Sequence, residues 1–280
     1  MAFKASKNRG KVVSAVVEGL QLIPSAPNRD WYNKQLVELI NDMVGDYAKE
    51  IEAEFKTKQV KKFYAADAGP TSAFTGLFNR LKKKWVSILS EKAKGISERF
   101  VKKVDVNSKA SVNFSISSLG IKEPVTTYNN NINATLSGCA AMNETLIKGL
   151  HEDLHEKVLK GVMLSITSPT PSEQGQKYVM QVLADAGISS KKRAKLIARD
   201  QTSKVYTSLN HDRMEQNGIT HFKWVHSSAG KVPRHSHVEK DGKIFALNDP
   251  RLWEGPKADQ GPPGWAINCR CRAVPVLDVD

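Results

Sequence analysis

Two short pairs of residues near the C-terminus carry the ligand types of a metal site. The histidines are His235 and His237, and the cysteines are Cys269 and Cys271. Each pair has i, i+2 spacing, and in an extended strand alternate side chains point to the same face. Two thiolates and two imidazoles form a ligand set that tetrahedral structural zinc prefers. The four residues therefore predict a site for one structural zinc.

The surroundings of these pairs leave an alternative open. The segment between His237 and Cys269 is rich in Gly, Pro and Trp and lacks a long helical period, as expected of a small β module that a metal would stabilise. Cys-x-Cys is a weak signal, however, and the fold must bring the two pairs together. The alternative is that the cysteines are small buried apolar residues and the histidines lie on a loop surface.

A second candidate site lies in the middle of the chain. His151-Glu152-Asp153-Leu154-His155 matches H-E-x-x-H, in which two histidines on adjacent helical turns bind zinc and the glutamate is the general base. A catalytic zinc needs a third protein ligand, and few acids or histidines follow in the helical part of the chain. The motif match makes a zinc metallopeptidase one alternative function. The competing interpretation is that the two histidines are boundary residues of an amphipathic helix.

Helical periodicity dominates the rest of the chain. Apolar residues recur every three or four positions between Tyr32 and Phe55 and again from about 72 to 101, which predicts an antiparallel hairpin broken near Gly69-Pro70. Residues 139–165 predict another helix with a leucine and valine stripe. We expect a shorter helix from Glu173 that ends at Gly187, then a helix over 191–217 capped by Ser189-Ser190.

The charge balance favours an acidic partner. Lysine and arginine outnumber aspartate and glutamate by 42 to 29, a formal net charge of +13, and nucleic acid is the commonest partner of such a chain. Two basic runs are the candidate contacts with phosphates: Lys82, Lys83, Lys84 and Lys191, Lys192, Arg193. The second run is predicted to open a helix, where cations oppose the helix dipole. The alternative is that these lysines only solvate the helices. A free non-specific nucleic-acid-binding protein is the other competing function.

The cysteine count and hydropathy indicate the cellular setting. Three cysteines in a chain of 280 residues argue against a disulfide-stabilised secreted scaffold. No apolar run reaches the roughly 18–20 residues that a membrane span requires. We therefore expect a soluble protein of a reducing compartment.

The C-terminal third resembles a known family. Its landmarks occur in the order found in phage Mu F-like head morphogenesis (minor head) proteins, and they cover about residues 190–276. The landmarks are Ile197-Ala198-Arg199-Asp200-Gln201-Thr202, Asn210, Arg213, Gly218, Trp224, Arg234, His237, Asp241-Gly242, Pro262-Pro263 and Asn268-Cys269-Arg270-Cys271.

The resemblance implies a non-enzymatic minor capsid protein of a tailed phage. Such a protein would act in procapsid assembly at the portal vertex, with the portal protein and the major capsid or scaffold proteins as partners. It would contact packaged double-stranded DNA non-specifically. It would be assembled in the host cytoplasm without a membrane step and would lie inside the virion head near the portal.

The resemblance also assigns roles to particular residues. The zinc ligands would be His237, Cys269 and Cys271, with a fourth from His235, Asp241 or another position. Arg199-Asp200-Gln201 stands where the family commonly has Arg-Thr-Glu. On physical grounds, Arg199 and Asp200 near the start of a long helix are expected to tie it to the β module by an ion pair; the alternative is solvated surface charge that contributes little. Asp241 and Gly242 are expected to be structural.

The predicted fold class is α+β, mainly α, with a long helical N-terminal region before a small C-terminal domain of one long helix and short strands. The predicted organisation is a basic arm (1–28), a helical hairpin (29–103), an Asn/Ser-rich linker or small hairpin (104–138), a helical region (139–187) and a Mu F-like C-terminal domain (188–280).

Overall fold

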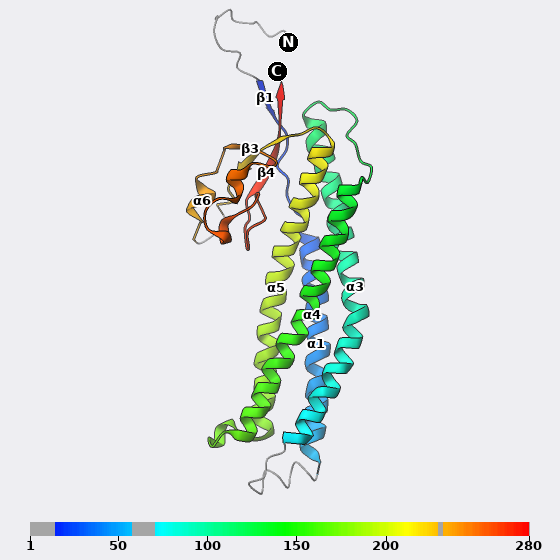
Figure 1. The fold of residues 1–280 in the computed structure, drawn as a ribbon, viewed down its shortest axis with the longest axis vertical. Helices are drawn as coiled ribbons and strands as arrows, with labels where there is room; N and C mark the ends of the chain where they lie inside the picture. Colours follow the sequence, from blue (N-terminus) through cyan, green and yellow to red (C-terminus); the bar gives the residue numbers. More distant parts are fainter. Residues whose placement is uncertain (1–14, 58–70, 229–231, 280) are drawn as a thin grey trace, which may run out of the picture.

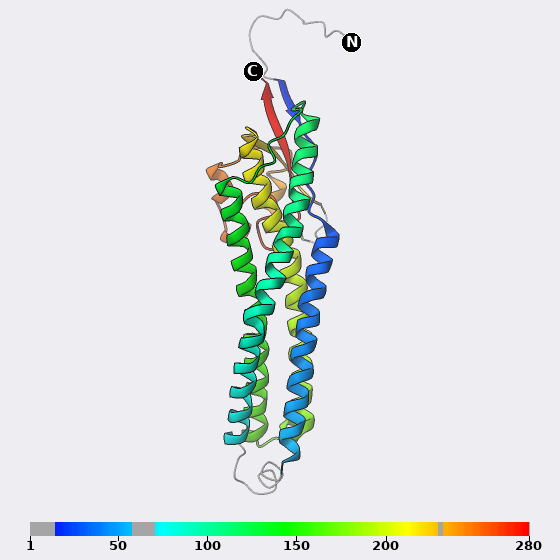
Figure 2. The same cartoon turned by 90° about the vertical axis from the view of Figure 1, so that its right-hand side faces the viewer.

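Four long helices form an antiparallel bundle with a small sheet at one end. The computed structural model describes residues 15–57, 71–228 and 232–279. The helices are α1 (Ala26–Lys56), α3 (Thr71–Ser118), α4 (Asn130–Thr167) and α5 (Gly175–Gln216). In Figures 1 and 2, α1 and α4 run in one direction and α3 and α5 in the other. The mainly α, α+β fold class is confirmed.

The hydrophobic stripes explain why the helices pack together. All seven stripe positions predicted between Tyr32 and Phe55 are buried on α1, and the leucine and valine stripe of α4 is buried from Leu150 to Val162. Ser25 is the N-cap of α1, and its hydroxyl accepts from the Asn28 N–H, which satisfies one of the free amides of the first turn. The predicted break near Gly69-Pro70 lies outside the described residues.

The prediction of a linker or hairpin over 104–138 is wrong for much of that range. α3 continues to Ser118, and only the stretch before Asn130 connects it to α4. The polar residues that indicated a loop face other helices instead. Ser108 donates to Asn210 Oδ1 at 2.7 Å, and Asp105 forms a buried ion pair with Arg213 of α5. These partners are distant in sequence, so local composition could not reveal them.

The predicted helix boundaries around Gly187 are also wrong. α5 is continuous from Gly175 to Gln216, so Gly187 does not end a helix and Ser189-Ser190 does not begin one. A Cβ atom on Gly187 would lie 3.0 Å from the Cγ2 atom of Val44. The glycine therefore permits the close approach of α1 and α5, and this packing overrides its low helix propensity.

The sheet contains strands from both ends of the chain. Its order is β1-β4-β2-β3, with every neighbouring pair antiparallel. The strands are β1 (Ala15–Glu18), β2 (His221–Val225), β3 (Ile244–Ala246) and β4 (Arg272–Val279). The short helical elements are α6 (His235–Val238), η1 (Pro171–Glu173), η2 (Pro250–Trp253) and η3 (Lys257–Asp259). Figure 1 shows the sheet beside the C-terminal half of α5.

The described part of the predicted basic arm is structured. β1 pairs with β4, and the following residues continue along the same strand, since Leu22 N–H donates to Ala273 O at 2.9 Å. Ser115 of α3 exchanges hydrogen bonds with the backbone of Leu20. The N-terminal segment therefore joins the sheet to the bundle. Residues 1–14 of the predicted arm lie outside the described residues. Within the described part, none of the helices has the length and apolarity to cross a membrane.

Candidate metal centre

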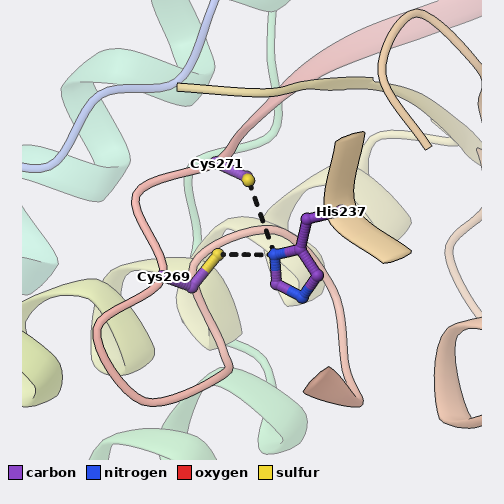
Figure 3. A group of neighbouring side chains, drawn as sticks. All are labelled: His237, Cys269 and Cys271. Atoms are coloured by element: carbon purple, nitrogen blue, oxygen red, sulfur yellow. Dashed lines mark hydrogen bonds between the residues drawn. The ribbon is translucent and has the colours of Figure 1, made fainter. Parts of the chain in front are cut away.

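Three of the four predicted metal ligands meet beside the sheet. His237 lies on α6, and Cys269 and Cys271 lie in the extended segment that enters β4. The Nδ1 atom of His237 is 3.5 Å from the Cys269 sulfur and 3.6 Å from the Cys271 sulfur. All three side chains are buried, and their ligand atoms lie within 4.8 Å of one another. Figure 3 shows both sulfur atoms facing the same ring nitrogen.

The second ring nitrogen of His237 has its own partner. Its Nε2 atom is 3.0 Å from the carbonyl oxygen of Asp259, which can only accept a hydrogen bond. The ring therefore carries a proton on Nε2, and Nδ1 faces the sulfurs; with a metal bound, Nδ1 would present its lone pair to the ion, as in metal-binding histidines. The Asp259 carboxylate accepts from Ser236 Oγ at 2.8 Å and pairs with Arg234 Nε at 2.7 Å. These contacts fix α6 against η3 and so orient the imidazole.

The cysteine segment is held by α5 and by a tight turn. Gly264 N–H donates to the Cys269 sulfur at 3.3 Å. A Cβ atom on Gly264 would lie 2.7 Å from Thr207 Oγ1, so only glycine allows the turn to approach α5 this closely. Asn268, with φ of 62°, binds α5 through its side chain and its backbone. The turn and the helix together place both sulfurs beside His237.

The predicted link between α5 and the β module exists, but Asn268 mediates it. Arg199 donates to Asn268 Oδ1, and Asp200 accepts from the Asn268 N–H at 3.3 Å. Asp200 forms its ion pair with Lys204 on the same helix, at 2.9 Å. The expected ion pair across the two regions is therefore replaced by hydrogen bonds to one asparagine.

Asp241 and Gly242 stabilise the turn that joins β2 to β3. Asp241 Oδ1 accepts from His226 N–H at 2.7 Å, and Gly242 N–H donates to Trp224 O at 2.8 Å. Gly242 has φ of 72°, in the left-handed region that favours glycine. Asp241 is not grouped with the three ligands, so its contacts in the structure are those of a turn residue.

His235 does not join the cluster. It lies on α6, where residues two apart point to different sides of the helix, and its side chain is exposed while His237 is buried. The expectation of an extended His235-Ser236-His237 segment is therefore wrong, and with it the fourth ligand that it supplied. Among the described residues, no further His, Cys, Asp or Glu belongs to the group.

The protonation of the cluster favours a thiolate. Hydrogen bonds from Cys271 and His237 lower the pKa of the Cys269 thiol well below its ordinary value, and the same shared proton raises the pKa of Cys271. Burial opposes protonation of His237, but its interaction with Cys269 raises the pKa of the imidazole overall. A bound divalent metal would displace these protons, because its ligands are the thiolates and the neutral imidazole.

The donor set fits zinc. One imidazole nitrogen and two sulfurs, all buried and facing one point, are three of the four ligands of a tetrahedral site. A polar cavity of about 400 Å³ adjoins all three residues and offers space for a fourth ligand from outside the group. His237, Cys269 and Cys271 would hold the ion, which would link α6 to the segment that enters β4.

The H-E-x-x-H motif lies elsewhere, in the core of the bundle. The Tyr47 hydroxyl is 3.1 Å from His151 Nε2 and 2.6 Å from His155 Nδ1, and all three residues are buried. The hydroxyl can donate to one ring and accept from the other. Glu152 is exposed on the outer side of the helix. Among the described residues, no third ligand joins the two histidines.

Burial also controls the protonation of this pair. Burial, His155 and Lys82 lower the pKa of His151 to about 4, and burial and Lys82 lower the pKa of His155. Both rings are therefore neutral at neutral pH. The pair serves as a polar contact between α1 and α4.

The two basic runs lie on the outer surface of the bundle. Lys82, Lys83 and Lys84 are exposed on α3, and Lys84 pairs with Asp46 at 2.6 Å. Lys191 and Lys192 are exposed on α5, where the neighbouring Arg193 pairs with Asp153 of α4. Because the second run lies in the middle of α5, the expectation that it opposes a helix dipole is wrong.

Sequence reasoning missed two residues that position the cluster. The Asp259 carbonyl group orients His237, and the Gly264 N–H group binds the Cys269 sulfur. Both contacts use the backbone, so the residue types gave no signal for the first. The Pro262-Pro263-Gly264 turn directly before the cysteines was the available signal for the second.

Comparisons with known proteins identify the region that contains this cluster. Residues 140–274 match the family described as Phage Mu protein F like protein. An uncharacterized protein of Haemophilus influenzae is 31% identical over 253 residues, which cover 89% of this chain and 53% of the relative. The chain thus spans about half the length of that relative. No solved structure matches the chain. The segment from α4 to β4 is therefore the part of this chain that matches the phage Mu F-like family.

Proposed function

We propose that the protein is a minor head protein of a tailed phage, with one structural zinc in its C-terminal region. The observation that carries the proposal is the position of the cluster: all three ligands lie within residues 140–274, the part that matches the family. The match to that family supports a role in head morphogenesis.

The zinc is proposed to be structural because it would join parts of a small module. β3 has three residues and α6 has four, so these elements contribute little core. Small domains of this kind gain stability from a metal. His237 and the two cysteines are separated by 32 and 34 positions, so one ion would close a long loop. Such a constraint stabilises the folded module relative to the unfolded chain.

We place the site of action at the portal vertex, inside the head, with the portal protein and the major capsid or scaffold proteins as partners. Co-expression with the portal protein of the same phage tests this. We expect the two proteins to co-purify through affinity capture and size-exclusion chromatography. A portal that elutes without this protein, at concentrations where procapsids form, would contradict the assignment.

The basic surface is proposed to contact packaged DNA without sequence preference. The net charge of +13 and the exposed lysines on α3 and α5 support this contact. Such binding weakens steeply with salt, because each phosphate contact releases counterions. We expect Lys82→Gln/Lys83→Gln and Lys191→Gln/Lys192→Gln variants to lower the salt dependence of duplex binding. Binding that persists undiminished at high salt would refute the contact.

A further inference from the structure

A second cavity adjoins the cysteine segment and has four arginines in its lining; it shares Arg199, Cys269 and Arg270 with the polar cavity beside the metal cluster. It has a volume of about 90 Å³ and is enclosed by the start of α1, by α5 and by the residues that enter β4. We call it the arginine cavity, after Arg29, Arg199, Arg270 and Arg272 in its lining. This volume exceeds what one water molecule needs and suits a group of several heavy atoms.

Two of the arginines that line the arginine cavity, Arg199 and Arg272, have no counter-charge within the described part of the chain, whereas Arg29 pairs with Asp30 at 2.8 Å. None of the described residues that line it is an aspartate or glutamate. Arg199 and Arg272 form no ion pair among the described residues: Arg199 donates to the Asn268 side chain and Arg272 to the Cys271 carbonyl at 2.9 Å. The nearby Asp200 is paired with Lys204. A half-buried guanidinium without a counter-charge is costly, so this site favours an anion.

One donor in the cavity wall has no partner. The Nε–H group of Arg199 is buried and makes no hydrogen bond among the described residues. A buried donor without a partner costs about 1–3 kcal/mol. The first turn of the 31-residue helix α1 faces the same cavity, and Ser25 at its N-cap contributes a hydroxyl. The positive end of the helix dipole adds to the attraction for an anion.

The metal cluster does not supply the missing negative charge. Cys269 lines the cavity, but the two thiolates would be balanced by a divalent ion. A cavity on the opposite part of the bundle provides the contrast. There, the lining contains Arg99 and Lys92 but also Glu38, Asp42 and Glu91, so acidic side chains accompany the basic ones.

We infer that the arginine cavity binds a phosphate group. Four arginines line this small cavity. Guanidinium groups suit the several oxygens of a tetrahedral oxyanion, which arginine binds through paired hydrogen bonds. The group comes either from a DNA backbone or from free phosphate. The inference goes beyond the proposed head function and does not depend on the identity of the metal.

The test is isothermal titration calorimetry of the zinc-loaded protein with inorganic phosphate at fixed ionic strength. We expect saturable binding by the wild type. Arg272→Gln and Arg29→Gln should each weaken it by about tenfold or more, since each removes a charge-assisted contact. Arg99→Gln is the matched control and should leave the affinity unchanged. Zinc content and circular dichroism are measured for every sample, so loss of phosphate binding is distinguished from loss of the metal or fold.

A second variant keeps the phosphate site testable if the first one does not fold. If Arg272→Gln does not fold, Arg29→Gln still tests the site, because the Arg29 side chain is 42% exposed. Phosphate binding that is absent in the wild type, or that Arg99→Gln weakens equally, overturns the inference. When binding is present, competition by a short duplex DNA assigns the site to a backbone phosphate. Lack of competition assigns it to free phosphate.

Discussion

The two histidine clusters of this molecule differ in what surrounds them. His151 and His155 lie one helical turn apart in the bundle core, where the Tyr47 hydroxyl occupies the space between them. His237 lies on a four-residue helix and meets two cysteines from a distant segment, beside a polar cavity. Soft ligands and access for a fourth ligand exist only in the second cluster. Whether a histidine can bind a metal therefore depends on the residues that pack around it in the fold. The H-E-x-x-H spacing shows only that two histidines lie on the same face of a helix.

The largest expected effect concerns the stability contributed by zinc. At free zinc about 100-fold above its dissociation constant, the wild type should gain about 2.7 kcal/mol in its free energy of unfolding. His237→Ala should abolish this gain. His235→Ala is the matched control, because that side chain is exposed two positions away, and it should retain the gain. Urea denaturation with and without zinc measures both. If both variants lose the zinc-dependent gain equally, His237 is not a specific zinc ligand.

Acid should destabilise the bundle through the first cluster. The pKa of His151 is about 4 in the folded protein, below the ordinary value of 6.5, so the unfolded chain binds the proton more tightly. The stabilising contribution is complete above pH 6.5 and is lost as the pH falls towards 4, with a magnitude of about 3 kcal/mol. Urea midpoints in chelator, which removes the metal contribution, measure this. A His151→Leu/His155→Leu variant with the same acid sensitivity would contradict the assignment.

Removing the hydroxyl between the two histidines should have a smaller effect. Tyr47→Phe leaves buried ring nitrogens without their shared partner, which costs about 1–3 kcal/mol. Tyr178→Phe is the control, because Tyr178 is only partly buried and the structure shows no side-chain hydrogen bond for it; it should change stability by less than about 0.5 kcal/mol. Thermal denaturation compares them. A Tyr47→Phe protein as stable as the control would mean that the hydroxyl contributes nothing to the pair.

The smallest effect is expected at the glutamate of the H-E-x-x-H motif. Glu152 is exposed, so Glu152→Gln should change stability by less than about 0.5 kcal/mol and leave the zinc content unchanged. In a metallopeptidase, the same substitution would remove the general base and perturb the metal site. Zinc loss in this variant would therefore place the metal in the bundle.

The sequence predicted the parts of the structure that depend on local patterns. Apolar periodicity identified the stripe of α1 and the helical class, and the cysteine spacing identified two candidate ligands whose sulfurs do lie close together. Local patterns gave wrong predictions where residues distant in the sequence determine the structure. Asp105 and Ser108 extend α3 because Arg213 and Asn210 pair with them, and His235 is excluded because α6 is helical. The backbone contact of Asp259 carries no residue-type signal that would reveal it, and for that of Gly264 the only signal was the Pro262-Pro263-Gly264 turn.

Elemental analysis of the purified protein tests the central claim most directly. The wild type, Cys269→Ser/Cys271→Ser and His151→Ala are compared after the same purification. The account predicts one zinc per chain in the wild type and in His151→Ala, and none in the double cysteine variant. Zinc that stays in the cysteine variant but is lost in His151→Ala would contradict it, as would a wild type without metal.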